Sequence, residues 1–182
     1  MPDALQLLKT RRSVKPMELS GPGPTRPEIG TLLSVASRVP DHGKLAPWRF
    51  IVFEGDARDA AGETIAAAFA ADHPGATPEQ IAFERKRLSR APLVIAVVSR
   101  ASPHVKIPEW EQQLSAGASA MSLVFAAHAM GYAASWITES RVMPISAELS
   151  SGSTIRLFLI MNRFSPAPSL TKPLASSSSA SS

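Results

Sequence analysis

Residues 7–13, Leu7-Leu8-Lys9-Thr10-Arg11-Arg12-Ser13, end a short predicted helix over 4–10 with two arginines and a serine. A second motif follows at 38–43, Arg38-Val39-Pro40-Asp41-His42-Gly43, and the first predicted strand begins at Pro47-Trp48-Arg49-Phe50. The two motifs place cationic and hydrogen-bonding groups in loops of an otherwise apolar chain. Guanidinium groups bind phosphates in a bidentate way, so these loops suit an anionic, planar ligand with many acceptors.

The composition indicates one globular domain. The chain has 182 residues, of which 45% are hydrophobic and 19% charged. It has no cysteine, which excludes disulfides, thiolate metal sites and cysteine nucleophiles and fits a cytoplasmic protein. The longest apolar stretch, 116–134, contains His128 and many small residues. We therefore expect a buried helix there, with neither a membrane span nor a signal peptide in the chain.

The charge distribution does not predict a nucleic-acid partner. The net charge is +4, but residues 1–139 carry 15 basic and 14 acidic side chains and are nearly neutral. No basic stripe with interleaved aromatic residues occurs.

Hydrophobic periodicity and capping signals predict an α+β fold. We expect helices over 4–10, 26–38, 57–71, 78–89 and 108–131, and strands over 47–54, 93–99 and 133–138. A dinucleotide-binding Rossmann fold is rejected, because the turn after the first strand has a single glycine, Gly55.

Several blocks of the sequence together resemble the nitroreductase family, in particular its small, minimal subgroup. Besides the two motifs, they are Arg90-Ala91-Pro92-Leu93-Val94-Ile95, Pro108-Glu109-Trp110-Glu111-Gln112, Ser115-Ala116-Gly117-Ala118 and Ala126-Ala127-His128-Ala129-Met130-Gly131. The resemblance covers residues 1–139. It implies a three-layer sandwich in which helices flank a mixed, mainly antiparallel sheet.

The resemblance also implies a function. A homodimer would bind FMN at its interface and pass electrons from NADH or NADPH to a small electron-poor acceptor, such as a nitroaromatic or a quinone, in a ping-pong order. The cofactor carries the hydride chemistry, so no catalytic side chain is expected. Two alternatives stay open: a catalytically silent flavin-binding or interaction protein, and a flavin-dependent dehydrogenase or flavin-consuming enzyme.

The family's site residues map onto two sets of positions. By resemblance, the FMN contacts are Arg11, Arg12 and Ser13 for the phosphate and ribityl chain, Arg38 and His42 from the partner subunit, and Trp136, Ile137 and Thr138. The segment that resembles a nicotinamide-cofactor site consists of Ala126, Ala127, His128, Ala129, Met130 and Gly131.

Structural interpretations compete with these assignments. Arg11 and Arg12 could cap the end of a helix. His42 could be a turn residue bonded to Asp41, and a lone helical histidine such as His128 fits a structural role. The remaining candidates are expected to be structural or to lie at the surface or a dimer interface: His104, Glu109, Glu111, Trp48 and Trp110.

The sequence changes character beyond Glu139. Thirteen of the 43 residues from 140 to 182 are serine, and only 155–161 keeps a strand-like apolar run, which could supply the family's last strand. We expect the domain to end near 164 and a disordered tail over 165–182. A shifted reading frame or a replaced C-terminus is the hypothesis for this change. Such a change of the C-terminus would weaken the dimer. Arg156 and Arg163 are then candidate phosphate ligands only because of their charge.

Overall fold

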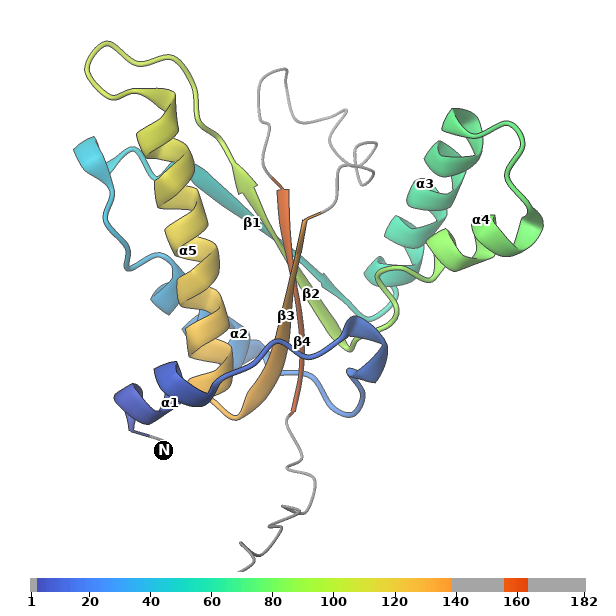
Figure 1. Ribbon diagram of the computed structural model, residues 1–182, viewed down its shortest axis with the longest axis horizontal. Coiled ribbons are helices and arrows are strands. Elements are labelled where there is room, and N and C mark those ends of the chain that lie inside the picture. The colour runs from blue at the N-terminus through green and yellow to red at the C-terminus, as the bar shows by residue number, and fades with distance from the viewer. Residues whose placement is uncertain (1–2, 139–155, 164–182) are drawn as a thin grey trace, which may run out of the picture.

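The structure is a computed structural model that describes residues 3–138 and 156–163 (Figure 1). Its elements are α1 (Ala4–Thr10), η1 (Pro16–Glu18), α2 (Arg26–Ala36), η2 (His42–Lys44), β1 (Trp48–Glu54), α3 (Ala57–Asp72), α4 (Pro78–Arg85), β2 (Leu93–Ser99), α5 (Glu109–Ala129), β3 (Tyr132–Thr138) and β4 (Arg156–Arg163). Every helix and strand expected from the sequence is present, and the α+β class is confirmed. The short 3-10 helices η1 and η2 were not expected. The serine-rich tail and the segment 139–155 lie outside the described residues.

The four strands form one sheet in the order β1-β2-β4-β3. The register places Trp48 opposite Ser99 and Leu93 opposite Met161. All three pairs of described strands are antiparallel, so the parallel component expected of a mixed sheet does not occur among them. The apolar run near the C-terminus forms β4, which lies between β2 and β3.

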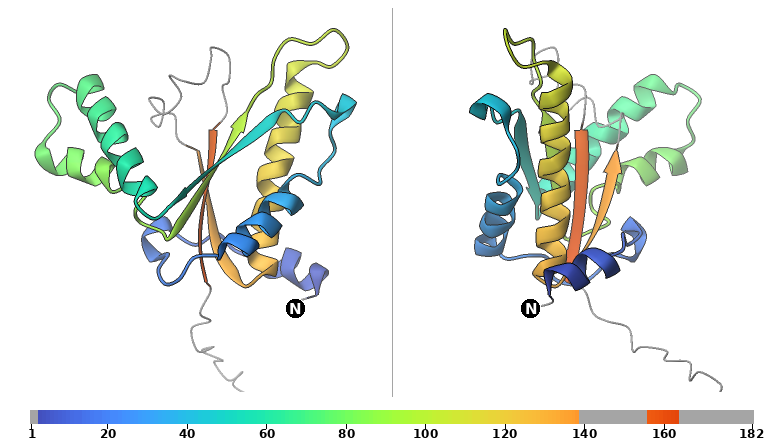
Figure 2. Two further views of the ribbon diagram at one scale, coloured as in Figure 1. Left: turned by 180° about the vertical axis from the view of Figure 1, so that it is seen from behind. Right: turned by 60° about the vertical axis from the view of Figure 1, so that its left-hand side comes forward.

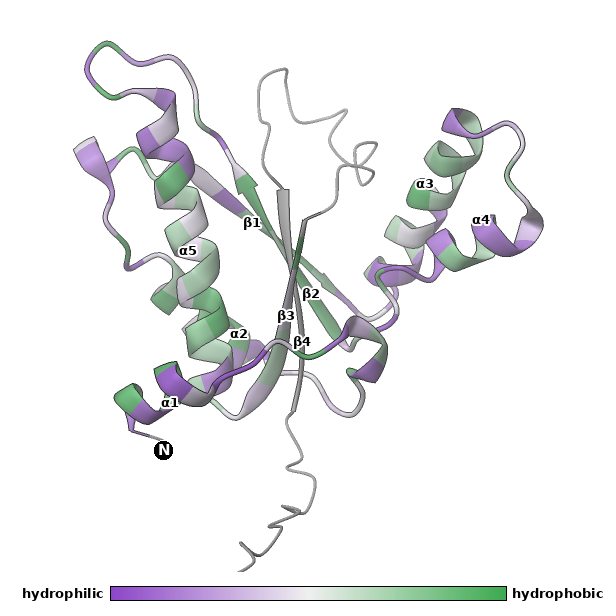
Figure 3. Cartoon of the chain, in the orientation of Figure 1, coloured by the Kyte–Doolittle hydropathy of each residue, from purple (hydrophilic) through white to green (hydrophobic). Residues whose placement is uncertain are grey.

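The central strand β2 is buried along its whole length. Leu93, Ile95 and Val97 pack with α2 and α5 in one core, whereas Val94 and Val98 belong to a second core that includes α3 residues. Side chains alternate between the two faces of a strand, so a strand covered on both faces needs a continuous apolar sequence. Figure 2 shows α2 and α5 on one side of the sheet and the α3–α4 pair on the other. Figure 3 shows the hydrophobic character of β2 between them.

Helices α3 and α4 form a hairpin whose base covers the second face and whose tip projects away from the sheet (Figure 1). The two helices approach closely, because a Cβ on Gly62 would lie 2.0 Å from the carbonyl oxygen of Arg85. Helix α4 ends four residues earlier than expected. Beyond it the Arg87 N–H donates to Glu84 O at 3.0 Å, and the Arg87 guanidinium pairs with the buried Glu84 carboxylate at 2.6 Å. This tight i,i+3 turn stops the helix.

The long helix α5 has 21 residues and lies along the sheet beside α2. Its C-cap is Met130, and Gly131 follows with φ +82°, so the glycine stop expected from the sequence is confirmed. At 1.5 Å per residue, α5 is about 30 Å long. Its start contacts the 38–43 motif through Glu111, and its last turn contacts the 11–13 motif through His128.

Candidate functional site

The Arg11-Arg12-Ser13 motif leaves α1 directly and runs beside β3. Arg11 is the C-cap of α1 with φ −55° and ψ 141°, so the backbone becomes extended there. The N–H of Val14, the next residue after the motif, donates to the carbonyl of Ala134 at 3.3 Å. The motif is therefore held between a helix end and a strand of the sheet.

The two arginines of this motif have different environments. The Arg12 guanidinium donates to the carbonyls of Arg11 at 2.9 Å and Lys9 at 3.4 Å, at the end of α1. Neither the Arg11 guanidinium nor the Ser13 hydroxyl has a hydrogen-bond or ion-pair partner within residues 3–138 and 156–163. Arg12 therefore fits the helix-capping interpretation, whereas Arg11 and Ser13 are available to a ligand.

A cavity of about 440 Å³ opens beside the motif. Its lining combines apolar and polar residues: Leu7, Thr10, Arg11, Arg12, Val14, His128, Gly131, Tyr132 and Ala133. The cations therefore lie at a mostly apolar hollow rather than on an open surface. An anionic group that carries a long organic part suits such a lining.

His128 connects this motif to the last turn of α5. Its Nε2 lies 3.1 Å from the carbonyl oxygen of Arg12, and its Nδ1 lies 2.9 Å from that of Val124. These contacts support the structural interpretation of His128.

The second motif forms a tight loop around η2. The Asp41 carboxylate accepts hydrogen bonds from the N–H groups of Leu45 at 3.1 Å and Ala46 at 2.8 Å. Gly43 has φ +71°, and a Cβ there would lie 2.5 Å from Ile107 Cδ1. Lys44 and Ala46 also have positive φ, an arrangement that L-residues adopt at a cost.

The partner of His42 is Glu111, so the alternative interpretation of His42 as a turn residue bonded to Asp41 is wrong. His42 Nδ1 lies 2.8 Å from Glu111 Oε2, while the Asp41 carboxylate is engaged by the loop backbone. Nearby, the Ser115 hydroxyl donates to Pro40 O at 2.5 Å. The N-terminal end of α5 thus fastens this loop. The sequence carried no local signal for the pair, because 69 positions separate its members.

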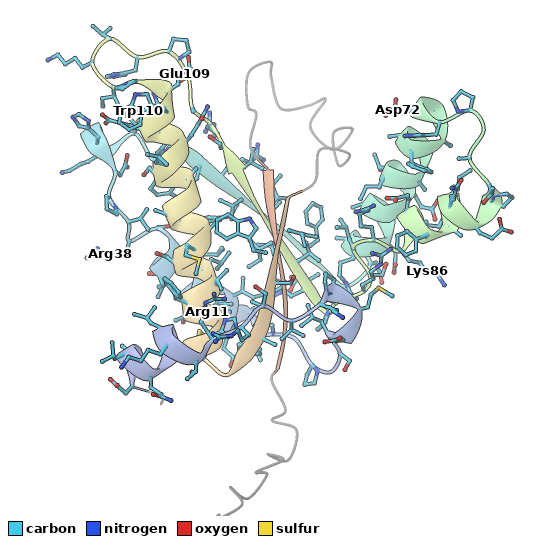
Figure 4. The ribbon with its side chains drawn as sticks, viewed as in Figure 1. Arg11, Arg38, Asp72, Lys86, Glu109 and Trp110 are labelled. Carbon is cyan, nitrogen blue, oxygen red and sulfur yellow. The ribbon has the colours of Figure 1, made fainter. Side chains whose placement is uncertain are left out.

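The structure places the first motif and the His42 end of the second motif at opposite ends of α5, whereas Arg38 lies partway along the helix (Figure 4). Glu111 meets His42 near its start, and His128 meets Arg12 in its last turn. These two α5 residues are 17 positions apart, which corresponds to about 25 Å along the helix axis. Figure 4 labels Arg11 toward one end of α5 and Trp110 at the other. One chain therefore does not bring Arg11 and His42 together.

The other predicted site residues lie at both ends of β3. Trp136 and Ile137 are half-buried and pack against different cores, so their side chains point to opposite faces of the sheet. In the segment 126–131, Ala126 and Ala127 are buried, and a ligand could reach only its later residues. The flavin and nicotinamide assignments of these residues stay predictions.

Within the described ranges, no three His, Asp or Glu side chains are grouped so as to hold a metal ion. None of the described helices is both long and apolar enough to cross a bilayer.

Comparison with known proteins places the chain in a family. The model of the nitroreductase family matches residues 8–151. The "Putative NAD(P)H nitroreductase YdjA" of Escherichia coli K12 is 38% identical over 146 residues, covering 78% of this chain and 77% of that protein. A "Putative NAD(P)H nitroreductase" of Haemophilus influenzae is 39% identical over 137 residues, covering 75% and 72%.

Solved structures share the fold. A nitroreductase-like family protein from Bacillus cereus superposes with a TM-score of 0.74 at 21% identity, covering 93% of this chain and 89% of that one. The FMN-dependent nitroreductase NfnB of Mycobacterium smegmatis, solved in complex with NADPH, gives 0.65 at 18% identity, covering 88% and 86%. The family match, the two relatives and the shared fold agree with the resemblance of the sequence blocks, and the chain belongs to the nitroreductase family.

Proposed function

We propose that this protein is an FMN-dependent oxidoreductase that passes electrons from NADH or NADPH to a small electron-poor acceptor, such as a nitroaromatic or a quinone. The names of its relatives and the NfnB complex support the donor and the cofactor. The observation that carries the proposal is the Arg11 guanidinium, which has no partner among the described residues and lines a cavity of about 440 Å³.

The available donors fit the phosphate end of FMN. The Arg11 guanidinium can bind two phosphate oxygens at once, and the Ser13 hydroxyl adds a neutral donor beside it. Apolar residues line most of the cavity beside Arg11, and less polar surroundings strengthen the charge-assisted hydrogen bonds of its guanidinium. Arg12 contributes indirectly, since its guanidinium fixes the end of α1 from which the motif departs.

FMN, when bound, supplies the hydride and electron chemistry, so the chain itself has to bind the cofactor, orient it and shield it from water. The nicotinamide donor and the acceptor must both approach the same ring of the cofactor. We therefore propose that they use one pocket in turn, which is a ping-pong order.

The position of the two motifs supports a homodimer. A two-fold axis perpendicular to α5 would set two copies of the helix antiparallel. The start of one α5, with its 38–43 loop, would then lie beside the end of the other, where Arg11 and Ser13 are. His42 of the partner subunit would reach the ligand that Arg11 binds, which it does not do within one chain.

Exposed apolar side chains support the same arrangement. Trp110 and Leu114, one turn apart near the start of α5, are 60% and 65% exposed. Leu5 and Leu8 of α1, near the other end of α5, are 58% and 52% exposed. An antiparallel pair of α5 helices would bury the first two residues against the partner's α1, which removes a large apolar area from water.

Absorbance spectroscopy of the purified protein tests this proposal. We expect the protein to keep a flavin spectrum after FMN is added and the unbound excess is removed by gel filtration, to be bleached by NADH or NADPH without oxygen, and to recover its colour when a nitroaromatic or a quinone is added. A protein that stays colourless with FMN contradicts the proposal. Bound FMN that neither nucleotide bleaches identifies a catalytically silent flavin-binding protein instead.

A further inference from the structure

His128 faces a backbone carbonyl with each of its ring nitrogens. Nδ1 lies 2.9 Å from Val124 O, the usual distance of a contact within its own helix, and Nε2 lies 3.1 Å from Arg12 O. The second contact joins positions 116 apart in the chain. We infer that His128 is a positioning residue, which orients the Arg12–Ser13 peptide so that Ser13 presents its donors to the phosphate of FMN; this inference rests on the function proposed above.

The motif needs such a fixed point because its other anchors lie at its two ends. At the start, the Arg11 N–H donates to Leu7 O at 2.8 Å, and after the end, the Val14 N–H donates to Ala134 O at 3.3 Å. Between these anchors the backbone has left α1 and has joined no strand. The His128 contact is placed where the peptide plane would otherwise be free to turn.

Planarity of the peptide bond carries the effect from Arg12 to Ser13. The Arg12 carbonyl, the Ser13 N–H and both Cα atoms lie in one plane, and in the trans peptide the N–H points away from the carbonyl oxygen. Holding the Arg12 oxygen toward His128 therefore directs the Ser13 N–H to the opposite side. That N–H has no acceptor among the residues that the structure describes.

The inference requires that His128 donates from Nε2, because a neutral ring protonated at Nδ1 would donate to Val124 O instead and leave the Arg12 carbonyl without a donor. Both facing atoms are carbonyl oxygens, which only accept, and a neutral imidazole carries a single N–H. A proton on Nε2 makes the contact to Arg12 and leaves Nδ1 facing Val124 O without a proton. An imidazolium makes both hydrogen bonds. A side chain with an N–H at the same place can replace the first contact, and glutamine meets this requirement.

Binding of FMN and riboflavin to three variants tests the inference. We expect His128→Leu to raise the Kd for FMN about tenfold, which corresponds to about 1.4 kcal/mol, while the Kd for riboflavin, which lacks the phosphate, changes by less than about twofold. His128→Gln restores most of the FMN affinity. His73→Leu is the matched control, because His73, the C-cap of the distant α3, makes the same Nδ1 contact to Phe69 O at 3.0 Å.

The possible outcomes distinguish a failure of this inference from a failure of the proposed function. In amide NMR spectra without flavin, we expect His128→Leu to shift the Ser13 resonance and His73→Leu to leave it in place. Equal FMN affinities for wild type and His128→Leu overturn the inference, and so does an equal loss for FMN and riboflavin, which would indicate general damage to the fold. A wild-type protein that binds neither flavin overturns the proposed function and, with it, the role of His128.

Discussion

Glu111 and His128 lie 17 positions apart on α5, and each holds one of the two motifs: Glu111 Oε2 is 2.8 Å from His42 Nδ1, and His128 Nε2 is 3.1 Å from Arg12 O. Helix α5 therefore sets a separation of about 25 Å between the motifs of one chain. The family resemblance assigns both motifs to one flavin. The two facts agree if each flavin is bound by the first motif of one subunit and the second motif of the other.

Replacing the arginines one at a time separates their roles. We expect Arg11→Ala to raise the Kd for FMN about tenfold to hundredfold, because a charge-assisted phosphate contact is lost. Arg12→Ala should lower the free energy of unfolding by about 0.5–1 kcal/mol, because its guanidinium caps α1, and should change FMN affinity less. Fluorescence titration with FMN and chemical denaturation measure both effects. A larger loss of FMN affinity in Arg12→Ala would reverse our assignment.

The exposed apolar residues at the start of α5 should control the dimer. We expect Trp110→Ser to weaken dimerisation by about 2 kcal/mol, or about thirtyfold in the dimer dissociation constant. The control is Phe83→Ser, since Phe83 is 54% exposed on α4, across the sheet from α5. Sedimentation at several protein concentrations measures the constant. Equal dimer constants for the two variants would exclude this face of α5 as the interface.

The packing of the α3–α4 hairpin predicts opposite effects at two helical glycines. Gly62→Ala would place a Cβ 2.0 Å from Arg85 O, so the helices must separate, and we expect unfolding free energy to fall by about 1–3 kcal/mol. In Gly30→Ala, in α2, the added Cβ meets no atom within 4 Å, and we expect the free energy of unfolding to rise by about 0.5–1 kcal/mol. Urea denaturation measures the free energy of unfolding of both variants. A neutral Gly62→Ala would show that the hairpin can open at little cost.

Local sequence signals predicted the secondary structure well. The Thr25 and Thr77 capping boxes begin α2 and α4, Gly131 follows the end of α5, and the continuous apolar run at 93–99 forms the strand buried on both faces. Each of these features depends on residues within a few positions of one another. The end of α4 was misplaced because the Glu84–Arg87 pair closes a turn that a helical pattern does not reveal.

The residues of the site could be predicted from the sequence, but the contacts that hold them in place could not. The motif residues were recognised by their order and by resemblance, whereas the contacts that hold them join positions 69 and 116 apart in the chain. The sequence also could not divide the roles of Arg11 and Arg12. That division depends on which guanidinium turns back onto the carbonyls at the end of α1, and only the three-dimensional structure shows it.

Mixing two variants with weakened FMN binding tests the shared site most directly. Arg11→Ala removes the proposed phosphate ligand of the first motif, and His42→Ala removes the proposed flavin contact of the second. If each flavin is bound by Arg11 of one subunit and by His42 of the partner subunit, a mixed dimer regains one intact site. We predict that mixing and refolding the two variants restores tight FMN binding to about one site per mixed dimer. If FMN affinity in the mixture equals the average of the separate variants, both motifs act within one chain and our account is wrong.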